Sequence, residues 1–398
     1  MSEGTVFLRT LTLNCWGVPF VTRDRRIRFK YIAEELSKGE YDVVALQEVI
    51  HSSDYELICK HLAQSHPFQH YFHSGVRSGV CIFSNCPIID SATFHYSINS
   101  SPYRVHQLDW YARKLLGLVK IQHQGIVINI FATHVCAIHT PSHLVDPLFS
   151  HRLAQCYEIS NIVRQVGSSA DVNILLGDLN SEPFSLPKKV LMANAGLKDV
   201  WDERPNSDDG SGETCERDCN YYTQLNKRVY EKFQDGMRID YIMYNGCHSY
   251  KVQCTDARLV MRKIPGSALS PSDHEALSAT LEIQHCKDTE PPGLSDDLLS
   301  LLEDLEDEFV SAYSAVQQKR LVSAGLATCL ALLLAVLQLT SITDLICAKS
   351  LICAILVIGF FICIWDICVQ RVFEASAFCS LIENVRIRML YIKNDKHG

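Results

Sequence analysis

The chain has 398 residues, and 37 lysine and arginine residues against 45 aspartate and glutamate residues give a formal net charge of −8. This length allows one large domain or two ordinary domains with appendages. The acidic balance argues against a protein that binds polyanions such as nucleic acid through a generally basic surface. The 17 cysteines are scattered through apolar segments, and Cys215 and Cys219 have no second pair to complete a zinc site. We therefore expect reduced, mostly buried thiols and a reducing compartment for the soluble part.

Short strand-like and helical segments alternate through the first 285 residues. The N-terminus lacks a basic region followed by a long apolar core, so we expect no secretory signal peptide. Helices are expected at residues 25–37 and 149–166, and strands at residues 7–14, 42–49, 79–84, 126–135, 172–180, 238–244 and 276–283. Interspersed strands and helices predict a layered α/β or α+β core.

Polar side chains recur where these strands end: Asn14, Glu48, His134, Asp178 with Asn180, Asp240, and Asp273 with His274. Taken singly, each has an ordinary structural explanation as a turn former, a cap or a solvated side chain. Taken together, their chemistry fits one purpose. Glutamate supplies a hard oxygen ligand of the type that Mg²⁺ prefers, aspartate and histidine can orient and deprotonate water, and asparagine and histidine can hydrogen-bond a phosphoryl oxygen.

The C-terminal third differs in composition. After a polar, proline-containing break, apolar residues recur at helical spacing among acidic ones: Leu298, Leu301, Leu302, Leu305, Phe309 and Tyr313. This pattern predicts an amphipathic juxtamembrane helix with a packing or self-association surface. Residues 321–340 then contain no charge, and residues 351–365 are apolar up to Asp366. The first run has the length of a membrane span, and the second reaches it only if Asp366 lies near an interface. Two such runs after an acidic linker disfavour the alternative of a buried core helix.

We therefore expect four parts: a catalytic domain at 1–285, an acidic linker and amphipathic helix at 286–320, two transmembrane helices at 321–371, and a short cytoplasmic tail at 372–398. Basic residues flank the pair of spans at Lys319 and Arg320 and again from Arg371 onward, whereas the loop between them holds only Asp344 and Lys349. The positive-inside tendency then places the catalytic domain in the cytosol. The membrane would be the endoplasmic reticulum, another intracellular membrane or the plasma membrane, and the helix or the spans could form a homodimer.

Seven motifs along the first domain resemble the endonuclease/exonuclease/phosphatase superfamily in their order: "LTLNCWG", "VVALQEV", "SGVCIFS", "FATHV", "LLGDLNSEP", "RIDYIMY" and "SPSDHEAL". The resemblance covers about residues 7–284. Within the superfamily the chain is similar to the membrane-anchored neutral sphingomyelinases, because of "NCWG", the segment "DWYARKLLGL" (109–118) and the two spans. The resemblance implies an α+β fold, a four-layer α/β/β/α sandwich followed by a transmembrane helical hairpin.

The same resemblance implies roles for the residues at the strand ends. Glu48 would be the principal Mg²⁺ ligand, with Asn14 in its shell and Mn²⁺ as a substitute ion. His274 would activate the attacking water, with Asp240 or Asp273 fixing its ring.

Three more residues would complete the catalytic set. Asp178 would position the water or hold His274, Asn180 would contact the phosphate, and His134 would stabilise developing charge or assist the leaving oxygen. The ion would neutralise phosphate charge and stabilise the departing alkoxide.

The resemblance also implies a conformational latch between Asp109 and Lys114. Leu108 and Arg113 precede them where relatives tend to have glycine, so a plain surface ion pair is the alternative. Tyr103, Trp110 and Tyr111 beside the latch are candidates to hold a choline head group through their aromatic faces, although aromatic residues are more often part of the core.

The expected reaction is hydrolysis of sphingomyelin to ceramide and phosphocholine at near-neutral pH, with lyso-choline phospholipids as side substrates. A phospholipase C or phosphatase acting on another membrane lipid is one alternative. A DNase-like nuclease would share the catalytic residues but needs a basic face for the phosphate backbone. An inactive scaffold would tolerate loss of the catalytic set, which is intact in this sequence.

Overall fold

The computed structural model describes residues 5–19, 21–103, 109–138, 140, 146–205, 210–226, 231, 236–247, 249–286, 297–339 and 346–395. The polar break expected after residue 286, Leu108 and the interhelical loop with Asp344 lie outside these ranges. The chain divides into two compact units, Met1–Leu301 and Leu302–Gly398.

Two six-stranded sheets form the centre of the first unit. The first sheet has the order β11 (Tyr250–Val260), β12 (Ala276–His285), β1 (Val6–Asn14), β2 (Val43–Gln47), β4 (Cys81–Ser84), β3 (Phe68–Tyr71). The second has the order β5 (Ile88–His95), β6 (Leu115–His123), β7 (Ile126–His134), β8 (Val172–Asp178), β10 (Asp240–Gly246), β9 (Lys198–Asp199). Both are mixed sheets, in which β1 pairs parallel with β2 and β7 pairs parallel with β8.

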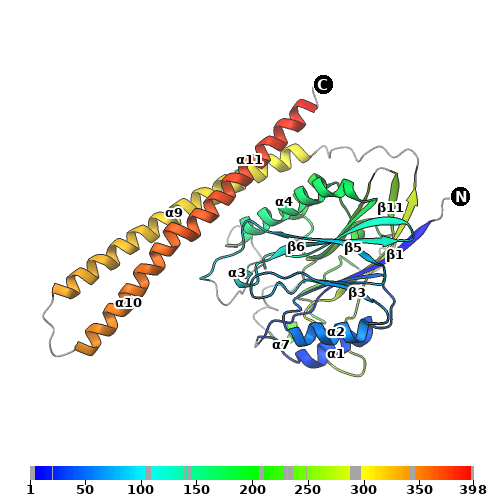
Figure 1. Cartoon of the computed structure of the whole chain (residues 1–398), viewed down its shortest axis with the longest axis horizontal. Helices are drawn as coiled ribbons and strands as arrows, with labels where there is room; N and C mark the ends of the chain where they lie inside the picture. The colour runs from blue at the N-terminus through cyan, green and yellow to red at the C-terminus, as the bar shows by residue number, and fades with distance from the viewer. Residues whose placement is uncertain are drawn as a thin grey trace. The chain divides into compact units, whose positions relative to one another are not determined.

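Helices cover the outer face of each sheet, as Figure 1 shows for α1 and α2 on one side and α4 on the other. The larger helices are α1 (Arg25–Leu36), α2 (Ser52–Leu62), α4 (Phe149–Val166) and α5 (Leu186–Ala195). Short helical turns lie in the connections: α3 (Asp109–Ala112), the 3₁₀ turn Gly167–Ser169, α6 (Val200–Glu203) and α7 (Tyr221–Leu225).

The side-chain pattern of β2 explains why the sheets are sandwiched. Val43 and Ala45 belong to the apolar cluster between the two sheets, whereas Val44 and Leu46 belong to the cluster beneath α1 and α2. A strand buried on both faces reads as a continuous apolar run rather than an alternating one. In the second sheet Ile174 faces the first sheet, and Leu175 faces the cluster that includes residues of α4. The predicted four-layer α/β/β/α sandwich is confirmed.

Strand register brings the polar strand ends to one edge of the sandwich. Asn14 pairs with Gln47, the residue before Glu48. In the second sheet His134 lies opposite Asp178, and Asp178 lies opposite Asp240. Residues separated by more than a hundred positions along the chain therefore meet at one site.

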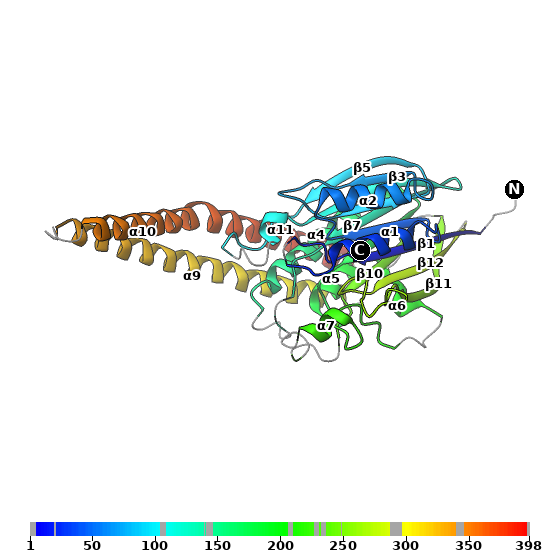
Figure 2. The same cartoon turned by 90° about the horizontal axis from the view of Figure 1, so that it is seen from below.

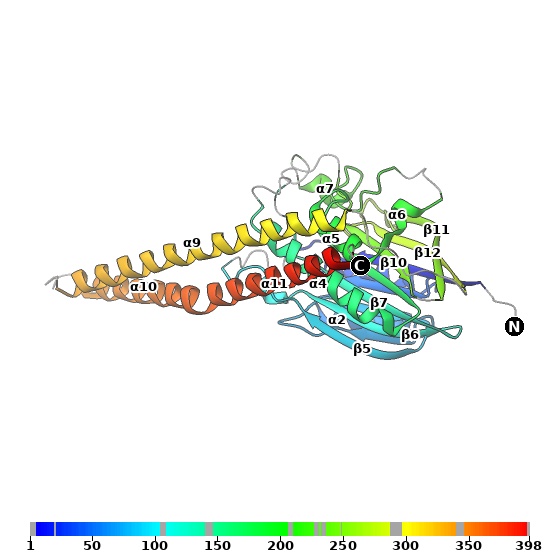
Figure 3. The ribbon, with the colours of Figure 1, turned by 90° about the horizontal axis from the view of Figure 1, so that it is seen from above.

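The second unit is a long helical hairpin. It contains α9 (Leu298–Leu339) from Leu302 onward, α10 (Ile346–Trp365), a π-helical turn at Asp366–Gln370 and α11 (Arg371–Asp395). Figures 2 and 3 show α9 beside α10 and α11 along its whole length. The expected amphipathic helix and first span are one continuous helix, and the expected tail continues the second helix.

Two segments of the hairpin, Leu298–Leu339 and Ala348–Asn394, are long and apolar enough to cross a membrane. Only 6% and 11% of their most apolar windows are buried, unlike the core helix of a soluble protein. Outside the apolar part, ion pairs join α9 and α11. Arg386 contacts Glu306 at 2.6 Å, and Lys393 contacts Glu303 at 3.3 Å.

Candidate active site

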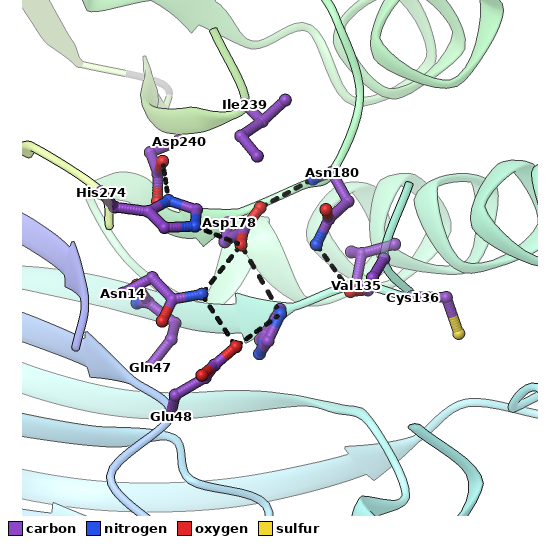
Figure 4. Close-up of polar contacts among 12 residues, drawn as sticks. Asn14, Gln47, Glu48, Val135, Cys136, Asp178, Asn180, Ile239, Asp240 and His274 are labelled. Carbon is purple, nitrogen blue, oxygen red and sulfur yellow. Dashed lines mark hydrogen bonds and ion pairs between the residues drawn. The ribbon is translucent and has the colours of Figure 1, made fainter. Parts of the chain in front are cut away.

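His274 and Asp240 form a short, buried polar contact at this edge of the sandwich. The Nδ1 atom of His274 lies 2.7 Å from Oδ2 of Asp240 (Figure 4). Of the two carboxylates considered from the sequence, Asp240 holds Nδ1, while Asp273 lies 4.0 Å from Nε2. Burial lowers the pKa of His274, but Cys215 and the Asp240 carboxylate oppose this effect, and the pKa lies well above the usual range for histidine.

Asp178 lies between the two histidines of the site. Its Oδ2 atom is 4.0 Å from Nε2 of His274 and 3.5 Å from Nε2 of His134, and its Oδ1 atom accepts the backbone N–H of Asn180 at 2.9 Å. Burial, and next the neighbouring Asp240, raise the pKa of Asp178 to about 7. This carboxylate therefore titrates near neutral pH.

Glu48 approaches the same point from the other sheet. Asn14 donates through Nδ2 to Oε1 of Glu48 at 3.2 Å and to Oδ2 of Asp178 at 3.1 Å, and so bridges the two sheets. The backbone of Glu48 has a φ of +57°, a strained conformation that is more frequent at functional sites than elsewhere. A Cβ atom on Gly17 would lie 2.0 Å from the Glu48 carbonyl oxygen, which explains the glycine of "NCWG".

The cluster has the donor set of a divalent cation site. Four carboxylates, from Glu48, Asp178, Asp240 and Asp273, meet here, and the ligand atoms of Asp178, Asp240 and His274 all lie within 4.8 Å of one another. Oε2 of Glu48 and Oδ1 of Asp240 are buried and accept no hydrogen bond within the part of the chain that the structure describes. Hard oxygen atoms left unpaired beside excess negative charge suit Mg²⁺ or a similar ion.

The side-chain oxygen of Asn14 already accepts a backbone hydrogen bond. Its Oδ1 atom accepts the backbone N–H of Trp16 at 3.0 Å, so the amide nitrogen faces Glu48 and Asp178. In this orientation Asn14 can align the two carboxylates, and Glu48 offers the free oxygen.

His134 contacts a buried ammonium group. Lys114 Nζ lies 2.8 Å from Nδ1 and 2.9 Å from Nε2 of His134, and 3.3 Å from Oδ1 of Asp109. Both side chains of the Asp109–Lys114 pair are 5% exposed, so the pair is buried rather than on the surface. Burial, and next Lys114, hold the pKa of His134 well below its usual range, which keeps the ring neutral.

Asn180 directs its side chain toward the loop after β7. Its Nδ2 atom donates to the Val135 carbonyl at 3.1 Å, and its Oδ1 atom accepts the N–H of Ile138 at 3.3 Å. Both the nitrogen and the oxygen of the Asn180 amide therefore bind the backbone of the segment that follows His134.

Two of the three candidate choline-binding aromatics, Trp110 and Tyr111, follow Asp109 on α3. Trp110 and Tyr111 make an edge-to-face contact with ring centroids 5.1 Å apart, and the Tyr111 hydroxyl donates to the Pro102 carbonyl. Tyr103 is 43% exposed. Within the described residues, the ring contact of Trp110 and the hydrogen bond of Tyr111 involve neither His274 nor Glu48.

Two residues near His274 could not be assigned to the site from the sequence. Thr214 accepts the backbone N–H groups of Ile239 and Asp240 on its hydroxyl, and Cys215 forms a β-bridge with His274. Both lie in a stretch without regular secondary structure, so no periodicity marks them. Ser272 was visible only as part of "SPSDHEAL"; its hydroxyl donates to the Asn14 carbonyl at 2.6 Å.

Known proteins are similar to this chain over most of its length. Residues 11–274 match the Endonuclease/Exonuclease/phosphatase family. Sphingomyelin phosphodiesterase 2 of Mus musculus is 33% identical over 314 residues, which cover 76% of this chain and 73% of that protein. A putative neutral sphingomyelinase of Caenorhabditis elegans is 34% identical, covering 69% and 67%. An inositol phosphosphingolipids phospholipase C of Schizosaccharomyces pombe is 30% identical, covering 70% and 69%.

A solved structure supports the fold. A mutant of beta toxin from Staphylococcus aureus, crystallised with bound magnesium ions, superposes with a TM-score of 0.54 at 19% identity, covering 69% of this chain and 99% of the toxin. With the confirmed sandwich and the ordered motifs, these matches show that the chain belongs to the endonuclease/exonuclease/phosphatase family, in the branch of the neutral sphingomyelinases.

Proposed function

We propose that this protein is a membrane-anchored, Mg²⁺-dependent phosphodiesterase that hydrolyses sphingomyelin to ceramide and phosphocholine near neutral pH. The observation that carries the proposal is the buried cluster of Glu48, Asp178, Asp240 and His274 at one edge of the sandwich, in a chain 32–34% identical to proteins named for sphingomyelin hydrolysis. The two long apolar helices support a substrate that resides in a membrane.

His274 is the proposed proton acceptor, and its contact with Asp240 supports this role. Asp240 occupies Nδ1 at 2.7 Å, which leaves Nε2 directed toward the space beside Asp178, where a water molecule can be deprotonated. Asp178 accepts a hydrogen bond from that water and keeps it between the two histidines.

His134 would stabilise the charge that develops on the reacting phosphate. Its ring is neutral and lies against the Lys114 ammonium, so the pair presents hydrogen-bond donors and positive charge to oxygen atoms that gain negative charge. Asp109 in turn holds Lys114 in place.

Glu48, with Asp178 and Asp240, would hold the divalent ion. When bound, the ion neutralises phosphate charge, stabilises the leaving alkoxide and favours the neutral form of His274. Mn²⁺ takes similar oxygen ligands and is proposed as a substitute.

Hydrolysis of an inositol-containing sphingolipid is the second candidate, because the fission yeast relative bears that name. The two substrates share the phosphodiester and the ceramide and differ in the head group. A choline head group calls for aromatic faces, for which Tyr103, Trp110 and Tyr111 remain the candidates, whereas an inositol calls for hydrogen-bond partners.

We further propose that the catalytic domain faces the cytosol at the endoplasmic reticulum or another intracellular or plasma membrane, that the hairpin supports a homodimer, and that nucleic acid is not a partner. The basic residues at both outer ends of the hairpin support the orientation. Protease added to intact vesicles should then digest residues 1–285, and protection until detergent is added would contradict the orientation.

Purified full-length protein should be assayed on sphingomyelin, lyso-phosphatidylcholine, an inositol phosphosphingolipid and plasmid DNA in one Mg²⁺ buffer. We expect a preference for sphingomyelin, loss of turnover in excess chelator, and recovery with Mg²⁺. His274→Ala provides the inactive control, since a positioned base contributes roughly 10²–10⁴-fold. Preference for DNA or for the inositol lipid, or full activity in chelator, would refute the proposal.

A further inference from the structure

Arg28 is a fully buried arginine on α1, with 0% of its surface exposed. Its guanidinium donates four hydrogen bonds, and all four acceptors are backbone carbonyl oxygens. Nε donates to Arg23 at 2.9 Å, Nη1 donates to Cys15 at 2.7 Å and to Pro271 at 3.2 Å, and Nη2 donates to Trp16 at 2.7 Å.

Two aromatic rings enclose the guanidinium. Its Cζ atom lies 4.8 Å from the centroid of the Trp16 ring and 5.6 Å from that of Tyr222. Arginine suits this place because its planar fork presents N–H groups in fixed directions and stacks on aromatic faces. Lysine has one ammonium with three donors and no plane, so it cannot reproduce the four contacts.

The first segment held by Arg28 carries Asn14. Cys15 and Trp16 directly follow Asn14 at the end of β1, and the N–H of Trp16 binds Oδ1 of Asn14 at 3.0 Å. That bond fixes which end of the Asn14 amide faces Glu48 and Asp178. Any shift of Trp16 therefore changes how the two carboxylates are aligned.

The second segment held by Arg28 carries His274. Pro271 precedes Ser272, whose hydroxyl donates to the Asn14 carbonyl at 2.6 Å and accepts the N–H of His274 at 3.3 Å. Arg28 and Ser272 thus join the same two segments at different points. Arg28 does so through the Cys15, Trp16 and Pro271 carbonyls, and Ser272 through Asn14 and His274.

We propose that Arg28 and Ser272 are positioning residues that set the placement of His274 relative to Asn14 and the carboxylates that Asn14 aligns. This inference rests on the proposed function, because it assumes that His274 and the Asn14-linked carboxylates act in phosphodiester hydrolysis. Neither residue needs to touch the substrate. Their effect is on the geometry of the reacting groups, where a displacement of about 1 Å can cost roughly 10²-fold in rate.

The test compares Arg28→Lys and Ser272→Ala with Arg25→Lys in the full-length protein. Arg25 lies on the same helix and binds Asp54 at 2.6 Å, outside both catalytic segments. We expect Arg28→Lys to lower kcat by roughly 10²-fold and Ser272→Ala to lower it by a smaller factor, with KM unchanged in both. Arg25→Lys should keep wild-type kcat even where its melting temperature falls.

Hydrogen exchange provides a readout that does not depend on turnover. Arg28→Lys should lose amide protection at residues 15–17 and 272–275 while the sheets keep theirs. Should Arg28→Lys fail to fold, Ser272→Ala decides, because it removes only a hydroxyl group.

Wild-type kcat in either folded variant, or a loss of kcat in Arg25→Lys equal to that in Arg28→Lys, would overturn the inference. Failure of the proposed function would look different. The wild-type protein would then not hydrolyse sphingomyelin, while the exchange difference between Arg28→Lys and Arg25→Lys would remain.

Discussion

Asp178 is a buried carboxylate that should lower the free energy of unfolding at neutral pH. Its folded-state pKa is raised to about 7, mainly by burial, from an ordinary value of 3.8. A group whose pKa is raised on folding contributes its full stability below the unfolded pKa and loses it as pH rises through the folded pKa. Without a cation, the free energy of unfolding should therefore fall between about pH 4 and pH 7, by at most about 1.4 kcal/mol for each pH unit.

Asp178→Asn should remove the fall in the free energy of unfolding between pH 4 and pH 7. At pH 7.5 in chelator, the variant should melt at a higher temperature than the wild type, because the amide keeps an acceptor for the N–H of Asn180 without a buried charge. Turnover should be lost. Calorimetry from pH 4 to pH 8, with and without Mg²⁺, makes the comparison, and near pH 4 the two proteins should converge. A variant less stable than the wild type in chelator at pH 7.5 would show that the carboxylate is structural.

The sequence predicted which side chains meet but not how they are held. Asn14, Glu48, His134, Asp178, Asp240 and His274 could be predicted because each ends or directly flanks a strand, and strand ends in adjacent register lie together. The supporting residues could not be predicted in this way. Arg28 appears as one more basic residue in "DRRIRFKYI", and its four carbonyl partners come from Arg23, residues 15–16 and Pro271.

At the scale of elements, most strands that carry the site residues were predicted, whereas β6, whose sequence begins with an apolar run, was not. β2 and β8 are buried on both faces and were expected from composition alone. β5, with the sequence "IIDSATFH", is an edge strand with mostly exposed or partly exposed residues, so its pattern carried little signal. The helices of the second unit were expected, but their continuity was not, since Lys319 and Arg320 mark a change of surroundings rather than an end of the helix.

The length of α9 has a physical consequence. Its 42 residues extend about 63 Å at 1.5 Å per residue, roughly twice the ~30 Å hydrocarbon core of a bilayer. About half of the helix therefore lies outside the apolar region, where Leu302, Leu305 and Phe309 are buried. The Phe309 and Phe378 rings pack 5.9 Å apart, so this half pairs with α11.

A polar contact near the start of the apolar part should fix the register of the two helices. The Ser323 hydroxyl donates to Oδ2 of Asp366 at 2.6 Å, and Arg371 Nε lies 3.2 Å from the same oxygen. Asp366 is 4% exposed and begins the π-helical turn, a local distortion often found at functional positions. Charged groups inside a membrane hairpin are retained mainly when they are paired.

Asp366→Leu should weaken the hairpin, because Ser323 loses its acceptor and Arg371 loses one of two acidic partners. Interhelical hydrogen bonds in membranes contribute roughly 0.6–1.7 kcal/mol, and we expect a loss of at least this size in an SDS titration followed by circular dichroism. Thr328→Val is the matched control, since the Thr328 hydroxyl donates to Ala324 within its own helix. Equal midpoints for Asp366→Leu and the wild type would show that the contact does not stabilise the pairing.

At the scale of the whole molecule, chemistry and membrane attachment belong to different units. The apolar clusters of the sandwich are built from residues between Val6 and Ile283, and every proposed catalytic residue lies in the same range. The apolar helices lie in the other unit. Such a division predicts that the anchor determines access to the substrate and leaves the chemical step unchanged.

A protein truncated after His285 tests this division, because β12 and therefore both sheets remain complete. On sphingomyelin in mixed detergent micelles its kcat should match that of the full chain. On sphingomyelin vesicles its rate should fall by a factor of roughly 10²–10⁴, the range over which tethering raises effective concentration. Fusing the truncated protein to an unrelated membrane helix should restore the vesicle rate, because proximity alone was lost. A truncated protein that fails in micelles while remaining folded would instead mean that the hairpin contributes directly to the active site, and equal rates on vesicles would mean that the anchor does not govern access to the lipid.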